Sequence, residues 1–159
     1  MSATATTPLP ADLLDLDALL SAEERAGRDR IRSFAGEQLR PHVAEWYEAG
    51  RLPAELPRLL GELGVLGMHL DGDGLPGSSA VEYGLACTEI EAVDSGLRTF
   101  VSVQGSLAMT AIHHFGSDEQ RGEWLAPLAA GEALACFALT EPEAGSCLLY
   151  TSPSPRDRS

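Results

Sequence analysis

The residues best suited to chemistry lie where a short apolar run breaks into a polar turn near the C-terminal end. Ala133–Leu139 is apolar on both faces, which predicts a buried strand. Pro142 lacks an N–H and Gly145 permits positive φ, so both favour departure of the backbone from a sheet. Such an exit leaves backbone donors unpaired beside the hydroxyls of Thr140 and Ser146, which suits a flat, acceptor-rich cofactor edge such as a flavin ring. An ordinary strand followed by a surface turn would give the same local pattern.

A wider resemblance gives this segment a more specific meaning. Residues 139–146 have the sequence LTEPEAGS, which resembles a motif of the acyl-CoA dehydrogenase family in which aspartate usually follows; here Cys147 stands at that place. The similarity extends back to Ser21. It is closest to the glutaryl-CoA dehydrogenase branch through DSGLRT at 94–99 and SVQGSL at 102–107. Two motifs at compatible spacing are more specific than either alone.

The resemblance implies FAD as the cofactor and an acyl-CoA as the substrate. The residues that it places along the flavin are Phe137, Ala138, Leu139, Thr140, Gly145 and Ser146. It also places Ser146 near the thioester of the acyl-CoA. From the local pattern alone, the Thr140 hydroxyl would cap its own turn, and Ser146 would be an ordinary turn serine.

Arg98 is the second candidate for binding. It stands at the start of a helix predicted over 97–115, the most apolar stretch of the chain, where a guanidinium is costly unless it is paired. Its planar fork suits a carboxylate. The resemblance implies that an arginine here binds the free carboxylate of a dicarboxylic substrate, with Thr99 beside it. A structural salt bridge from Arg98 to Glu91 or Asp94 is the alternative that the residues leave open.

The family's reaction is α,β-desaturation of an acyl-CoA, in which a carboxylate takes the α-proton and hydride passes to the flavin. Decarboxylation follows in the glutaryl branch. The family's catalytic glutamate lies beyond Ser146, so we assign no catalytic residue in this chain, and Glu141 and Glu143 are not candidates. The chain alone is therefore expected to be an inactive fragment that retains no FAD. An electron-transfer flavoprotein acceptor and a homotetramer are implied for the full-length enzyme.

Two other classes of function stay open from the sequence. One is a flavin acyl-CoA oxidase, or a dehydrogenase for another short or branched acyl-CoA. The other is a non-enzymatic helical interaction module. No cysteine or histidine spacing predicts a metal site, because the adjacent His113 and His114 point in different directions on a helix.

Three serine-led capping boxes divide the chain into helices. They begin at Ser21, Ser79 and Ser117, and we expect the first two helices to run to about Leu39 and Val93 and the third to close at Gly131. Further helices are expected over His42–Ala49, between Pro53 and Gly64, and over 97–115. The Gly-rich residues 71–77 are expected to form a loop.

The predicted fold is mainly α: the N-terminal helical bundle of the acyl-CoA dehydrogenase fold plus the first strand of a middle β-domain. The expected divisions are a flexible arm at 1–20, the helical domain at 21–132, the start of the β-domain at 133–146, and a tail at 147–159. The tail, read as codons, resembles a transposase adapter used for sequencing libraries. We therefore expect it to be non-native; a natural disordered tail is the alternative.

Composition and charge exclude further classes of protein. The 159 residues suffice for one domain with a core, and the net charge of −13 argues against a nucleic-acid partner. No apolar run reaches the length of a membrane span, and 1–10 has no signal-peptide pattern. The three cysteines are odd in number, which favours reduced thiols and a cytoplasmic location.

Overall fold

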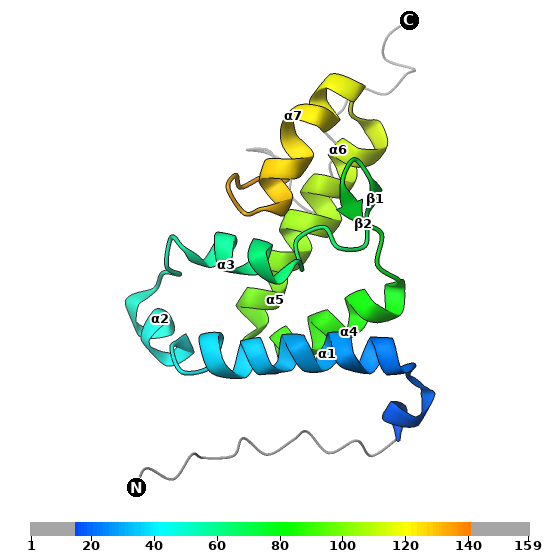
Figure 1. Cartoon of the computed structure of the whole chain (residues 1–159). Helices are drawn as coiled ribbons and strands as arrows, with labels where there is room; N and C mark the ends of the chain where they lie inside the picture. Colours follow the sequence, from blue (N-terminus) through cyan, green and yellow to red (C-terminus); the bar gives the residue numbers. More distant parts are fainter. Residues whose placement is uncertain (1–14, 141–159) are drawn as a thin grey trace, which may run out of the picture.

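The computed structural model describes residues 15–140, which form a helical bundle with one short hairpin (Figure 1). The mainly α fold class predicted from the sequence is confirmed. In chain order the elements are η1 Leu16–Leu19, α1 Ala22–Phe34, η2 Ala35–Leu39, α2 Val43–Ala49, α3 Leu56–Leu63, β1 Asp71–Gly72, β2 Leu75–Pro76, α4 Ala80–Glu91, α5 Ser95–Ser102, η3 Val103–Met109, α6 Thr110–Phe115 and α7 Asp118–Ala129.

All three capping boxes are confirmed. The hydroxyls of Ser21, Ser79 and Ser117 accept hydrogen bonds from backbone amides three residues on, at 3.1, 3.2 and 3.2 Å. The side chain of that later residue accepts in turn from the N–H of the serine. Each box satisfies amides that have no partner inside the helix, so the starts of α1, α4 and α7 follow from local chemistry.

Residues 95–115 form one long helix, as the apolar stretch predicted, but its middle third, η3, is π-helical. Figure 1 shows this helix rising from α4 towards the far end of the molecule. Leu97, Val101 and Met109 are buried on it, as expected for a central helix. Apolar residues also lie on its exposed side, because Leu107 and Phe115 are 48% and 89% exposed.

Two apolar clusters hold the helices together. The larger joins α1, η2, α3, α4 and α5 through Ile31, Ala35, Leu39, Leu56, Leu60, Leu63, Val65, Leu66, Met68, Ala86, Ile90, Leu97 and Val101. The smaller joins η3 to α7 and the start of the hairpin through Leu70, Met109, Leu125 and Leu128. The long helix contributes to both clusters and therefore ties the two halves of the bundle.

Two local predictions between α2 and α4 need correction. Pro53 does not lie in the first turn of α3; its carbonyl accepts from Leu56 N–H in the preceding turn, and Pro57 takes the early helical position instead. Residues 71–77 are not only a loop, because Asp71 pairs with Pro76 and Gly72 with Leu75 in a two-stranded hairpin. Its two turn residues both have positive φ, which matches the twist of a tight hairpin.

Two glycines bring α3 and the end of α7 into backbone contact. A β-carbon on Gly61 would lie 2.3 Å from the Ala130 carbonyl oxygen, and one on Gly131 would lie 2.0 Å from the Pro57 carbonyl oxygen. Both distances are far below any van der Waals contact, so only glycine permits this approach. Gly131 also has φ of 68°, and it closes α7 as predicted.

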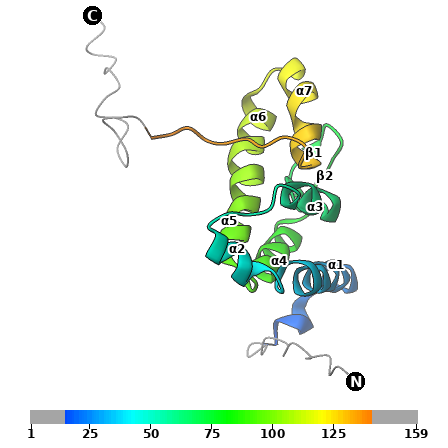
Figure 2. The ribbon, with the colours of Figure 1, turned by 90° about the vertical axis from the view of Figure 1, so that its left-hand side faces the viewer.

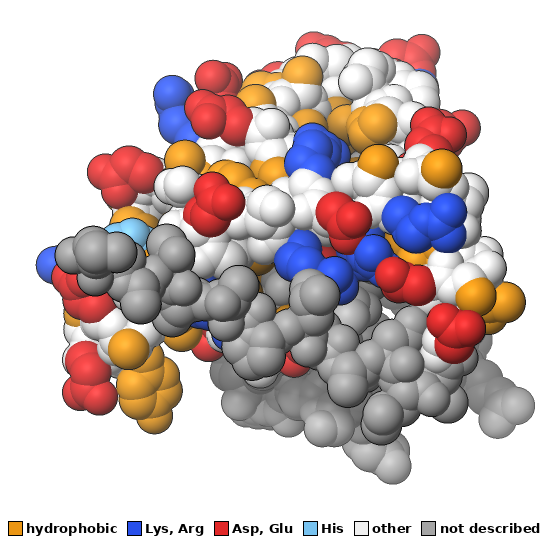
Figure 3. Space-filling model, turned by 60° about the horizontal axis from the view of Figure 1, so that its bottom comes forward, with side chains coloured by type: hydrophobic (Ala, Val, Ile, Leu, Met, Phe, Trp, Pro, Cys, Tyr) orange, Lys and Arg blue, Asp and Glu red, His pale blue; other side chains and the backbone are white. Residues whose placement is uncertain are grey.

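The described residues before α1 are held by polar contacts. Arg25 donates to the backbone carbonyls of Asp17 and Leu20, and the buried Arg28 pairs with Asp17 and Asp29. Arg32 forms a two-pronged pair with Glu89 of α4. Figure 3 shows this face, on which arginines are interleaved with acidic side chains. Residues 1–14 of the predicted arm lie outside the described residues.

Candidate functional site

The segment after α7 differs from the sequence prediction. Figure 2 shows it leading away from the helices. Residues 133–140 form no strand, and Phe137 and Leu139 are 50% and 52% exposed. The predicted buried strand is therefore wrong for these residues. A strand needs a neighbouring backbone ladder, and within residues 15–140 none lies alongside this segment.

Gln104 holds the beginning of the segment. Its side-chain amide, 1% exposed, donates to the carbonyls of Leu128 and Ala133 at 3.1 and 2.9 Å. Its oxygen accepts from Ala135 N–H at 3.1 Å. All three bonds arise from one side chain on the π-helical η3, so the long helix sets where the chain departs after α7. These bonds satisfy the Gln104 amide, whose burial without a partner would be unfavourable.

Four of the predicted flavin-contacting residues are described, and all four are exposed: Phe137, Ala138, Leu139 and Thr140. One hydrogen bond, from Leu139 N–H to the Phe137 carbonyl at 2.9 Å, tightens the backbone here. Within residues 15–140, Thr140 makes no hydrogen bond. An exposed backbone with open polar groups and flanking apolar side chains suits the edge of a flat heteroaromatic ring. Gly145 and Ser146 lie outside the described residues.

Arg98 lies near the beginning of α5 and is paired within the chain. Its Nε donates to Glu91 Oε2 at 2.5 Å, and its Nη1 lies 3.4 Å from Ser102 Oγ. The pairing with Glu91 raises the pKa of Arg98. Asp94, the other partner considered from sequence, instead caps α5 by accepting from Leu97 N–H at 3.0 Å.

A hollow of about 450 Å³ opens beside Arg98. It is lined by Cys87, Thr88, Glu91, Ala92 and Arg98. The exposed Thr99, predicted to act beside Arg98, is not among these residues. No binding role was predicted for Cys87 from the sequence. Its spacing of four from Glu91 on a predicted helix was the available signal that both share one face.

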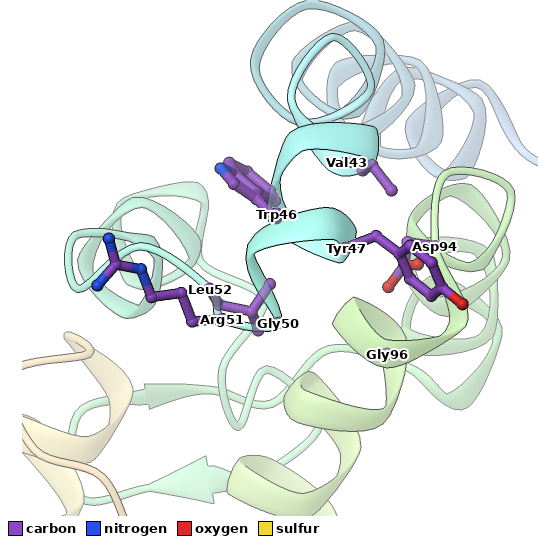
Figure 4. Close-up of a pocket in the computed structure, with 8 residues that line it drawn as sticks. All are labelled: Val43, Trp46, Tyr47, Gly50, Arg51, Leu52, Asp94 and Gly96. Carbon is purple, nitrogen blue, oxygen red and sulfur yellow. The ribbon is translucent and has the colours of Figure 1, made fainter.

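A second hollow, of about 500 Å³, lies between α2 and the start of α5 (Figure 4). Trp46 and Tyr47 of α2 line it together with Asp94 and Gly96 at the start of α5, and the Tyr47 ring lies beside Asp94. No site was predicted from the sequence at these residues. The adjacent aromatics before Gly50 were the one signal, because a helix this short buries neither of them fully.

Polar side chains continue from Arg98 along the contact between α4 and the long helix. We call this set the polar seam; it comprises Tyr83, Cys87 and Glu91 on α4 and Arg98, Ser102 and Ser106 on the long helix. Tyr83 Oη lies 2.8 Å from Ser106 Oγ. Burial raises the pKa of Tyr83, and the hydroxyls of Ser106 and Ser102 oppose that rise.

His69 packs at the inner end of the polar seam. Its ring centroid lies 4.6 Å from that of Tyr83, and its Nε2 lies 3.4 Å from Thr110 Oγ1. Burial lowers the pKa of His69, and His113 lowers it further. His113 Nε2 lies 2.7 Å from the Asp71 carbonyl oxygen, which ties α6 to the hairpin.

Comparison with known proteins places this bundle in a family. Residues 21–132 match the model of the acyl-CoA dehydrogenase N-terminal domain, so the chain belongs to the acyl-CoA dehydrogenase family. Within it, two solved structures of a glutaryl-CoA dehydrogenase from Mycobacterium smegmatis are similar. One is 61% identical, with a TM-score of 0.81 over 85% of this chain and 35% of that chain. The other, in complex with FADH2, is 55% identical, with a TM-score of 0.81 over 84% of this chain and 35% of that chain.

A curated relative is more distant. The short-chain specific acyl-CoA dehydrogenase of Clostridium acetobutylicum is 32% identical over 132 residues, which are 82% of this chain and 35% of the relative. The chain thus spans about a third of the length of these relatives. Among the described residues, no helix is both long and apolar enough to span a membrane.

Proposed function

We propose that this chain is the N-terminal part of an FAD-dependent acyl-CoA dehydrogenase that desaturates a short-chain acyl-CoA, with glutaryl-CoA as the favoured substrate and oxidative decarboxylation as the outcome. The observation that carries the choice of substrate is the position of Arg98. Its guanidinium borders a hollow large enough for a small acyl end, in a chain that is 61% identical to a glutaryl-CoA dehydrogenase.

Arg98 is proposed to bind the free carboxylate of the substrate. Arginine presents its N–H donors in a planar fork and carries a permanent charge, so it suits a carboxylate better than lysine does. Glu91 and Ser102 hold the guanidinium at the hollow. Thr99 would add a hydroxyl from the next position of α5, and Ser146 would lie near the thioester.

Phe137, Ala138, Leu139 and Thr140, followed by Gly145 and Ser146, are proposed to lie along the flavin. The exposure of residues 137–140 supports this role, because open backbone groups can face a ring edge. Bound FAD supplies the acceptor for the β-hydride of the substrate. Gln104 contributes by fixing the chain at Ala133 and Ala135, only a few residues before the flavin-contacting stretch.

The chain contributes no catalytic base to this proposal. The family's base lies in a C-terminal helical domain, so we expect the 159 residues alone to retain no FAD and to oxidise no acyl-CoA. The start of a β-domain at 133–146, an electron-transfer flavoprotein acceptor, a homotetramer and a cytoplasmic location belong to the same proposal, supported by the family resemblance.

The test is made on the product of the intact gene. We expect it to be purified with bound flavin and to oxidise glutaryl-CoA in preference to butyryl-CoA. Arg98→Met removes the charge at similar length, and loss of a charge-assisted bond is expected to lower kcat/KM for glutaryl-CoA by about 10- to 100-fold. Arg51→Met, at the other hollow, is the matched control. A colourless protein that cannot be reconstituted with flavin would refute the proposal.

A dehydrogenase for another short acyl-CoA is the second candidate, favoured by the similarity to the short-chain specific enzyme of Clostridium acetobutylicum. A preference for butyryl-CoA that Arg98→Met leaves unchanged would select it. Formation of hydrogen peroxide without an added electron acceptor would identify an oxidase instead.

A further inference from the structure

Gln104 makes hydrogen bonds to the segment after α7 that match those of a neighbouring strand. Its side-chain amide donates to the Ala133 carbonyl at 2.9 Å and accepts from Ala135 N–H at 3.1 Å, so the two bonds bracket Leu134. One residue of a parallel strand makes the same pair of bonds, to the carbonyl before and the amide after the residue beside it. A side chain of η3 thus takes the place of a strand partner, which residues 133–140 lack within the described part of the chain.

We propose that Gln104 is a positioning residue for the flavin, which fixes residues 137–140 where they meet the ring. This inference rests on the proposed function, in which those residues lie along FAD. It adds that the effect is the same for every acyl-CoA substrate, because Gln104 acts on the flavin side of the site and Arg98 on the substrate side.

The groups around the Gln104 side chain require a carboxamide. The carbonyls of Leu128 and Ala133 accept and Ala135 N–H donates, so their partner must offer two donors and one acceptor. These needs also fix which end of the amide carries the nitrogen. Methionine has a similar length and no N–H, so Gln104→Met fills the same space and removes both bonds to the carbonyls.

The backbone beneath Gln104 is itself held in place. The neighbouring Gly105 packs on the turn at Gly67, because a β-carbon on Gly105 would lie 2.9 Å from Gly67 N. The fully buried Met109 also contacts this turn, since its Cε would lie 2.5 Å from a β-carbon on Gly67. Gln104 therefore projects from a closely packed part of η3, and the segment after α7 is the part that follows.

The residues that Gln104 holds lie close to the predicted flavin contacts along the chain. Ala135 precedes the stretch 137–140 by two residues, so at most about 7 Å of backbone separates them. A shift of Ala135 is therefore carried into that stretch, and a misplacement of about 1 Å at a reacting pair costs about 100-fold in rate. Arg98 lies earlier on the same helix, and its printed contacts with α4 and α5 do not involve Gln104.

The experiment compares variants of the intact flavoenzyme with two substrates. Gln104→Met is expected to lower kcat about 10- to 100-fold for glutaryl-CoA and butyryl-CoA alike, with the ratio of the two KM values unchanged. The dissociation constant of FAD should rise about three- to tenfold, the range for one hydrogen bond, and the visible spectrum of the bound flavin should shift. Gln38→Met, the same change at an exposed position of η2, is the matched control and should alter none of these quantities.

A second control separates positioning from stability. Leu39→Ala removes a fully buried side chain of the larger apolar cluster and leaves the bonds of Gln104 intact. It should lower the stability of the enzyme at least as much as Gln104→Met does, because it leaves a cavity. The flavin spectrum and kcat of Leu39→Ala should nevertheless match those of the wild type.

The outcomes separate this inference from the proposed function. A kcat and a flavin spectrum that Gln104→Met leaves unchanged, or a spectrum that Leu39→Ala changes equally, would overturn the positioning role and leave the proposed function intact. A loss confined to glutaryl-CoA would assign Gln104 to the substrate side and would also overturn it. A wild type that binds no flavin would overturn the proposed function, together with the inference that rests on it.

Discussion

The surroundings of Arg98 and the segment 133–140 are both predicted binding regions, yet they are built differently. Arg98 pairs with Glu91 of α4 and contacts Ser102 of the long helix, and Tyr83 of α4 pairs with Ser106 of the long helix. The segment 133–140 is tied to the bundle at its beginning by Gln104 and is largely exposed after that. Motif similarity points to both regions, but only packing decides whether a region is held in place by the residues at hand.

The largest expected difference between the two regions is in stability. Leu60→Ala removes a fully buried side chain of the larger cluster and should lower the free energy of unfolding by about 2–5 kcal/mol. Leu139→Ala, in the exposed segment, should change it by less than about 0.5 kcal/mol. Urea denaturation followed by circular dichroism measures both. A similar cost for the two variants would show that the segment packs on the bundle.

The next prediction concerns the residue that joins the two regions. Gln104→Met leaves the Ala133 carbonyl and the Ala135 amide without their partner, which should cost about 1–3 kcal/mol. Amide hydrogen exchange at Ala135 should accelerate at the same time. Gln38→Met, at an exposed position of η2, is the control and should alter neither quantity. Unchanged exchange at Ala135 would mean that Gln104 does not hold the segment.

A smaller effect is expected at the start of α5. Asp94→Ala removes the N-cap next to Arg98 and should cost about 0.5–2 kcal/mol. Amide exchange of Leu97, the capped residue, reports the fraying directly. Asp94→Asn keeps a capping oxygen and should recover most of the stability; equal losses in the two variants would argue that charge, not capping, matters here.

The smallest effect is the response of His69 to pH. Burial lowers its pKa in the folded state, so the unfolded chain binds the proton more tightly. The contribution of His69 is complete above its unfolded pKa of about 6.5 and is lost as the pH falls below that value. Unfolding midpoints at pH 7.5 and 5.5 should therefore differ less in His69→Gln than in the wild type. His114→Gln, at an exposed histidine, should retain the wild-type difference.

Local chemistry made much of the fold predictable. Serine capping boxes gave the starts of α1, α4 and α7, and Gly64 gave the end of α3. Pro53 was misplaced because Pro57 satisfies the same preference for an early helical position. The π-helical stretches were not predicted, since a period of 3.6 residues and a slightly wider one place apolar residues on nearly the same face.

Residue types could single out Arg98 as a candidate but could not give all of the side chains around it. Arg98 was singled out because an unpaired guanidinium is energetically costly in an apolar helix. In the structure it pairs with Glu91, one of the two partners considered. The polar seam could not be foreseen, because it depends on the alignment of two helices. The strand expected over 133–139 failed for a related reason: apolar character indicates what a strand could bury, but a strand forms only where a partner ladder exists.

The contact through Gly61 and Gly131 bears on how the predicted flavin segment is aimed. Because neither glycine has a β-carbon, the end of α7 packs directly on the backbone of α3, and this contact helps to set the direction of the segment. Even alanine, the smallest side chain with a β-carbon, would push the two helix ends apart and displace residues 132–140. The direction of this segment is thus sensitive to substitution at two positions that have no side chain.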